Sequence, residues 1–106
     1  MSEKFNPDQE GGLTVATARP NVAHPPEYVV LLHNDDYSTM EFVIEVLTRF
    51  FSKSHEEAIE ITLKVHREGK GVAGRYSLQI AETKVYQVTE LARSRGFPLR
   101  STFEKA

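Results

Sequence analysis

The polar residues best suited to binding a ligand lie in one short segment, HNDDYSTMEFV. Asn34, Asp35 and Asp36 place one amide and two carboxylates close to the apolar side chains of Met40 and Val43. Such a cluster suits a cationic ammonium group carried on a hydrophobic residue, because the cation needs charged or polar acceptors when it leaves water. Asn and Asp are also ordinary turn formers, so a purely structural turn is the alternative.

A second polar group that could join this site is His66, which shares one helical side with Thr62 and Val65. A neutral imidazole nitrogen can accept a hydrogen bond from an ammonium group, and protonation would replace that attraction by repulsion. A histidine near a helix end is also a common packing or capping residue. Both interpretations stay open from the sequence.

The pattern gives little support to catalysis or metal binding. Asp35 and Asp36 are adjacent in the chain rather than opposed across a cleft, and no serine or histidine lies in a recognisable nucleophile motif. The four histidines show no i,i+4 spacing and there is no cysteine, so no zinc site or disulfide is expected. We therefore predict a binding protein without catalytic residues, metal or cofactor; a hydrolase that uses the two aspartates is the enzymatic alternative.

Composition limits the chain to one modest domain. It has 106 residues, of which 40% are hydrophobic, enough for a single core. Thirteen basic and fifteen acidic residues give a net charge of −2, which offers no general attraction for nucleic acid. No apolar run reaches the roughly 18 residues of a membrane span, and the amino end lacks the pattern of a secretory signal. We expect a cytoplasmic monomer that binds neither nucleic acid nor membrane.

Six elements must position the candidate site. Hydrophobic periodicity predicts strands at 28–32, 71–76 and 99–104 and helices at 39–51, 55–68 and 78–95. The expected fold is therefore α+β, with a three-stranded antiparallel sheet packed with three helices in the order β-α-α-β-α-β. Residues 1–26 hold four prolines and a glycine pair without any period, and we expect a flexible N-terminal extension to a core domain at 27–106.

Two helix starts are predicted from capping boxes, one formed by Ser38 with Glu41 and one by Ser54 with Glu57. In each box a hydroxyl and a carboxylate would satisfy the free backbone N–H groups of the first turn. Gly69 is expected to end the second helix in the left-handed conformation.

Several separated motifs resemble the ClpS family, whose members are adaptors for the AAA+ protease ClpAP. They are HNDDYSTMEFV, KVHREGKGVAG, AETK and the ending PLRSTFEKA, and they are colinear over roughly residues 25–106. The resemblance implies a non-enzymatic adaptor that binds N-degron substrates of the N-end rule, whose first residue is Leu, Phe, Tyr or Trp, and delivers them to the unfoldase ClpA. A ribosomal-stalk-like interaction domain, with the same architecture but without a pocket for an N-terminal residue, is the alternative.

Carried over position by position, the resemblance implies that Asn34, Asp35 and His66 hold the α-ammonium group of the substrate. The residues that would line or rim its side-chain pocket are Leu32, Asp36, Ser38, Met40, Val43, Thr62, Val65 and Leu99. Met40 is similar to the gatekeeper residue that excludes the β-branched residues Val and Ile.

Two positions depart from the family pattern. Thr62 stands where the family usually has a larger apolar residue, often Met, so a smaller and more polar pocket edge is expected. Gln79 replaces a commonly acidic residue in the region that, in the family, docks on the N-terminal domain of ClpA. That contact is therefore expected to depend more on Glu82 and Lys84. The N-terminal extension, which engages the unfoldase in ClpS-like proteins, is similar mainly in being long and flexible.

Overall fold

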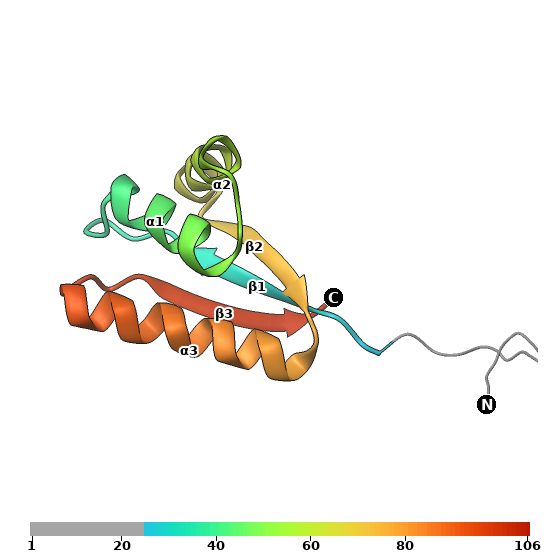
Figure 1. Ribbon diagram of the computed structural model, residues 1–106. Helices are drawn as coiled ribbons and strands as arrows, with labels where there is room; N and C mark the ends of the chain where they lie inside the picture. The colour runs from blue at the N-terminus through green and yellow to red at the C-terminus, as the bar shows by residue number, and fades with distance from the viewer. Residues whose placement is uncertain (1–24) are drawn as a thin grey trace, which may run out of the picture.

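The computed structural model describes residues 25–106, so all but the last two residues of the predicted extension, 1–26, lie outside the described part. The elements are β1 (Tyr28–His33), α1 (Met40–Phe50), α2 (His55–Glu68), β2 (Lys70–Tyr76), α3 (Leu78–Arg95) and β3 (Arg100–Lys105). This confirms the predicted β-α-α-β-α-β order, and the element ends that differ from the predictions do so by one residue. In Figure 1, α3 runs alongside β3, and α2 lies near β2.

The sheet is antiparallel, with β1 in the centre and the strand order β2-β1-β3. Leu32 of β1 lies opposite Gly71 on one side and Ser101 on the other. The register with β2 shifts between Val30 and Leu31, which marks a β-bulge in the edge strand. The predicted α+β class is confirmed.

A single core lies between one face of the sheet and the three helices. Val30 and Leu32 of β1 are fully buried, as are Val46 and Leu47 of α1 and Val88 of α3, and all five belong to one cluster. Burying each such side chain stabilises the fold by about 1.5 to 3 kcal/mol. The core thereby fixes the end of β1 relative to α1 and α2, the three elements that bear the predicted site.

The second predicted helix start is confirmed. The Ser54 Oγ accepts a hydrogen bond from the Glu57 backbone N–H at 3.1 Å, and Glu57 Oε1 accepts from the Ser54 N–H at 2.9 Å. At the other end of α2, Gly69 has a φ of 90°, as the predicted left-handed ending requires.

The first predicted capping box, Ser38 with Glu41, is wrong. The N-cap of α1 is Thr39, whose Oγ1 accepts from the backbone N–H of Phe42 at 3.1 Å. Ser38 instead belongs to the preceding turn, because its backbone N–H donates to Asp35 Oδ1 at 2.7 Å. Two consecutive hydroxyl residues made either start possible in the sequence, and the Asp35 turn decides between them.

Candidate functional site

A cavity of about 270 Å³ lies where the turn after β1 meets α1 and α2. Nine of the predicted binding residues line it: Asn34, Asp35, Asp36, Ser38, Met40, Val43, Thr62, Val65 and His66. The fold therefore brings together the two segments that sequence analysis identified separately.

The other two predicted pocket residues, Leu32 and Leu99, do not line this cavity. Leu32 is fully buried and Leu99 is 5% exposed, and both pack in the core cluster with the cavity residues Val43 and Val65. Leu99 also lines a separate hollow of about 250 Å³ at the turn between α3 and β3. They belong to the core and not to the lining of the cavity.

Asp35 is held in position by its own turn. Its Oδ1 accepts hydrogen bonds from the backbone N–H groups of Tyr37 at 2.8 Å and Ser38 at 2.7 Å. Its Oδ2 is buried and has no hydrogen-bond partner among the described residues. A buried acceptor without a donor costs roughly 1 to 3 kcal/mol, and more when it is charged. The Ser38 hydroxyl beside it is also buried without a partner in residues 25–106.

The turn also keeps the Asp35 carboxylate ionised. Burial opposes the charged form, but the backbone N–H groups of Ser38 and Tyr37, with a smaller effect of the nearby Ser38 side chain, outweigh it and lower the pKa of Asp35 below its ordinary value. At neutral pH Asp35, one of the residues that line the cavity, therefore carries a negative charge.

A backbone hydrogen bond joins the two segments that carry the polar residues. The N–H of Asn34 donates to the carbonyl of Gly69 at 2.8 Å, which ties the turn after β1 to the end of α2. His66 lies in the last turn of α2, and both Asn34 and His66 are exposed. Their side chains thus stand at the solvent side of the cavity, while Asp35 lies deeper.

The apolar wall of the cavity comes from α1 and α2. Val43 is 6% exposed and Val65 is 3% exposed, whereas Met40, at the first position of α1, is 46% exposed. Met40 therefore lies at the mouth of the cavity and the two valines lie at its base.

Thr62 lines the same cavity and is 3% exposed. Its Oγ1 donates to the Ala58 carbonyl of its own helix at 2.7 Å. The hydroxyl is therefore satisfied within α2, which cancels much of the polarity expected at this edge. The other expected difference remains, because Thr62 is smaller than the apolar residue that the family usually has at this position.

The predicted partner-binding residues lie in the first half of α3. Gln79 and Glu82 are exposed. Lys84 is half-buried, and its Nζ donates to the Phe50 carbonyl at the end of α1 at 2.6 Å. The same Nζ lies 5.6 Å from the centroid of the Tyr76 ring. Sequence analysis missed this internal role, because Lys84 and Phe50 are 34 residues apart and no local pattern connects them.

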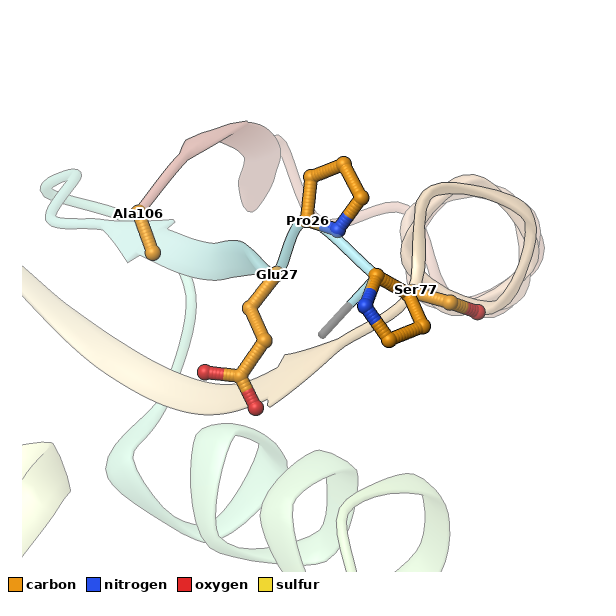
Figure 2. Close-up of a pocket in the computed structure, with 5 residues that line it drawn as sticks. Pro26, Glu27, Ser77 and Ala106 are labelled. Atoms are coloured by element: carbon orange, nitrogen blue, oxygen red, sulfur yellow. The ribbon is translucent and has the colours of Figure 1, made fainter. Parts of the chain in front are cut away.

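An open hollow of about 690 Å³ lies at the beginning of α3 (Figure 2). It is lined by Pro25, Pro26, Glu27, Ser77 and Ala106. Ser77 is the N-cap of α3, and the nearby apolar residues Leu78 and Ile80 are 40% and 49% exposed. Sequence analysis did not find this hollow, because its residues come from three distant parts of the chain.

Among residues 25–106, no three His, Cys, Asp or Glu side chains are grouped so that they could hold a metal ion. None of the helices in this range has the length and apolar character needed to cross a membrane.

Fold and cavity together define a small α+β binding module, in which the ionised Asp35 and apolar side chains line one cavity. Residues 23–102 match the family model described as the ATP-dependent Clp protease adaptor protein ClpS. This chain belongs to the ClpS family.

Similar proteins cover most or all of the chain. The ATP-dependent Clp protease adapter protein ClpS of Desulforapulum autotrophicum is 56% identical over 82 residues, which are 77% of this chain and 79% of that protein. The ClpS of Xanthomonas campestris pv. campestris is 47% identical over 106 residues, the full length of both. The solved structure of Agrobacterium tumefaciens ClpS2 bound to L-phenylalaninamide has a TM-score of 0.75 and 38% identity, and covers 78% of this chain and 100% of that one.

Family membership makes the chain a non-enzymatic adaptor of the Clp protease, as its motifs predicted. The hydrolase alternative is set aside by this membership. So is the ribosomal-stalk-like alternative, which gives no reason for Asp35 and His66 to line one cavity.

Proposed function

We propose that this adaptor binds, in the cavity of Asp35 and His66, the free α-amino group and bulky first residue of N-degron substrates. It then delivers them to ClpAP by docking on the N-terminal domain of the ClpA unfoldase. The observation that carries the proposal is the buried Oδ2 of Asp35, an anionic acceptor without a donor among the described residues. An α-ammonium group supplies both the missing donor and the compensating charge.

The polar part of the site matches an ammonium group in number as well as in charge. An ammonium has three N–H donors. Asp35 Oδ2, the side-chain oxygen of Asn34 and a ring nitrogen of His66 can supply three acceptors, and all three residues line the same cavity. Each hydrogen bond to a charged group contributes about 1.5 to 3 kcal/mol.

The apolar part of the site accounts for the preference for Leu, Phe, Tyr or Trp at the first position. The remaining proposed contacts are Asp36 and Ser38 at the turn, Met40 at the mouth, and Val43, Thr62 and Val65 along the wall, with Leu32 and Leu99 supporting that wall. Burying a Leu or Phe side chain contributes about 1.5 to 3 kcal/mol. Together with two or three charged hydrogen bonds, less the ordering cost, the affinity should be near micromolar.

The ligand of the related Agrobacterium tumefaciens ClpS2 supports this proposal. L-phenylalaninamide, to which that protein is bound, carries a free α-amino group next to an aromatic side chain. These are the two features that the cavity of the present chain is proposed to recognise.

Docking on the unfoldase is proposed for the beginning of α3. Exposed Gln79 and Glu82 can form polar contacts there, and exposed Leu78 and Ile80 can bury apolar surface. Lys84 would contribute from a position already fixed by Phe50. We also propose that the adaptor is cytoplasmic and monomeric and needs no cofactor.

The test compares a fluorescent peptide that begins with Phe with its amino-acetylated twin, using fluorescence anisotropy. Acetylation removes the charge and two donors, so the affinity should fall at least about tenfold, the equivalent of about 1.4 kcal/mol. Equal binding of the two peptides would reject the ammonium site. A peptide with Gly at the first position is the control for the apolar wall and should also bind weakly.

A further inference from the structure

The sheet has a second face, which we call the outer face, on the side away from the helix core. Residues directly opposite each other in a sheet point to the same side. The register therefore places three rows on this face: Arg75–Val29–Glu104, Val72–Leu31–Thr102 and Lys70–His33–Arg100. Val29 and Leu31 are buried, at 8% and 6% exposed, but they do not belong to the core cluster that the helices share with Val30 and Leu32.

Basic side chains dominate the outer face. Lys70, Arg75 and Arg100 are exposed, and Glu104 is the one carboxylate in the three rows. Within residues 25–106, the ion pairs involve Glu45 and Glu90 and none of these three cations. Three cations against one carboxylate make this face positive, although the whole chain has a net charge of −2.

His33 lies at one end of the face, paired with Lys70 on β2 and Arg100 on β3. Its Nε2 lies 2.7 Å from Thr102 Oγ1. Burial lowers the pKa of His33, and the charges of Arg100 and Lys70 lower it further against the opposing effect of Glu104. The imidazole is therefore neutral at pH 7, and the charge of the face comes from the lysine and the two arginines.

An apolar residue lies between two of the cations on an edge strand. Val72 is 42% exposed and stands between Lys70 and Arg75 on β2, which pairs with β1 on one side only. Edge strands present unpaired backbone groups to an incoming chain. Alternate residues of an extended chain share one side, and residues i and i+4 are about 13 Å apart. Lys70 and Arg75 are i and i+5 on β2, and Ala73, the extra residue of the bulge, lies between them. The two cations therefore match the spacing of residues i and i+4 in a regular extended chain.

We infer that the outer face docks an extended acidic segment of a partner protein, with one apolar residue over Val72 and carboxylates toward Lys70 and Arg75. Charge complementarity selects an acidic partner. Nucleic acid fits less well, because the three rows contain no Phe, Tyr or Trp on which a base could stack, and Glu104 would repel phosphates. The inference concerns a face other than the cavity and does not depend on N-degron binding.

The test titrates the ¹⁵N-labelled full-length protein with the peptide acetyl-Ser-Glu-Ser-Val-Ser-Glu-Ser-amide, followed by NMR. Acetylation keeps the peptide out of the proposed ammonium site. We expect shifts at the amides of Val29, Leu31 and Val72, and a loss of binding at about 1 M salt, where charges are screened beyond about 3 Å. The same peptide with both glutamates replaced by glutamine should cause no shifts.

Two double variants, each of which removes two positive charges, distinguish binding at the outer face from general electrostatic attraction to the protein. Lys70→Gln with Arg75→Gln should weaken binding of the acidic peptide about fivefold or more, since two exposed ion pairs are lost. Lys64→Gln with Arg67→Gln, two exposed positions on α2, should leave it unchanged. The inference is overturned by absent shifts, by equal weakening in both variants, or by an oligo-dT strand that shifts the outer-face amides more strongly than the peptide does.

Discussion

The backbone N–H of Asn34 and the carbonyl of Gly69 form a 2.8 Å hydrogen bond between the turn after β1 and the end of α2. This bond connects Asn34, which lines the cavity, to Gly69, which ends α2. Gly69 has a φ of 90°, a conformation that other residues adopt only with strain. The geometry of the cavity mouth therefore depends on one backbone conformation.

Gly69→Ala should lower both stability and peptide binding. The open space around its Cβ position leaves backbone strain as the cost, about 1 to 3 kcal/mol in the free energy of unfolding. Gly96→Ala is the matched control, because Gly96 ends α3 with a φ of 75° and also has open space around it. Urea unfolding should show a loss in both variants, whereas anisotropy should show weaker binding for Gly69→Ala alone. Equal affinities in the two variants would contradict a role of the Asn34–Gly69 bond in the site.

Asp35→Asn should abolish most of the binding without unfolding the domain. The amide oxygen can still accept from Tyr37 and Ser38, but an uncharged N–H donor replaces Oδ2, so the cavity loses the negative charge of this residue. Loss of one charged hydrogen bond corresponds to about a 10- to 100-fold lower affinity. Asp36→Asn, at an exposed neighbour on the same cavity, is the control and should change affinity less than Asp35→Asn does. Unchanged binding of Asp35→Asn would make the aspartate a turn residue only.

Asp35 also gives a pH dependence of a definite sign. Its pKa is lower in the folded state than the ordinary value of 3.8, so its contribution to stability is fully present above that value. The contribution is lost as the pH falls below 3.8 through the folded-state pKa. The stability difference between the wild type and Asp35→Asn should therefore be constant from pH 7 to about pH 5 and should change below 3.8. Thermal unfolding of the wild type and of Asp35→Asn across this pH range tests the prediction. A stability difference that begins to change near neutral pH would contradict Asp35 as its cause.

The fold was predictable because its signals are local. Ser54 and Glu57 are three residues apart, and their capping box follows from the sequence alone. The Ser38 prediction failed because a residue outside the helix, Asp35, binds the Ser38 backbone and leaves the cap to Thr39. A local pattern gives candidates for a helix start, and the neighbouring turn selects one.

The site was only partly predictable, because its residues come from segments that are distant in the sequence. Single motifs identified Asp35 and His66 as candidates, but only the register of β1 and the path of α2 bring them to one cavity. Contacts between distant residues, such as that of Lys84 with Phe50 or the rows of the outer face, leave no periodic trace in the sequence. The family resemblance supplied residue roles that spacing could not.

Met40→Ala should widen the range of accepted first residues. Met40 is about half exposed at the mouth of the cavity, so truncation opens space near the Cβ of a bound residue without removing core packing. Peptides that begin with Val or Ile should then approach the affinity of the Leu peptide in anisotropy titrations. Thr62→Val is the control: the hydroxyl of Thr62 already bonds within its own helix, so discrimination should persist. If Met40→Ala still rejects Val and Ile, the gatekeeper role is wrong.

Lys84 has two candidate roles that one variant can separate. Its Nζ donates to the Phe50 carbonyl at the end of α1, so Lys84→Met keeps the aliphatic stem but removes the donor. Because the side chain is only half-buried, the free energy of unfolding should fall by about 1 kcal/mol, below the usual value for a charged hydrogen bond. Lys64→Met, at an exposed lysine on α2, should change the free energy of unfolding by less than about 0.5 kcal/mol.

Glu82→Gln should weaken binding to the isolated N-terminal domain of ClpA at unchanged stability, because Glu82 is exposed. A Lys84→Met variant with wild-type stability and weak unfoldase binding would instead make Lys84 a direct contact, since the Phe50 bond would then contribute nothing measurable.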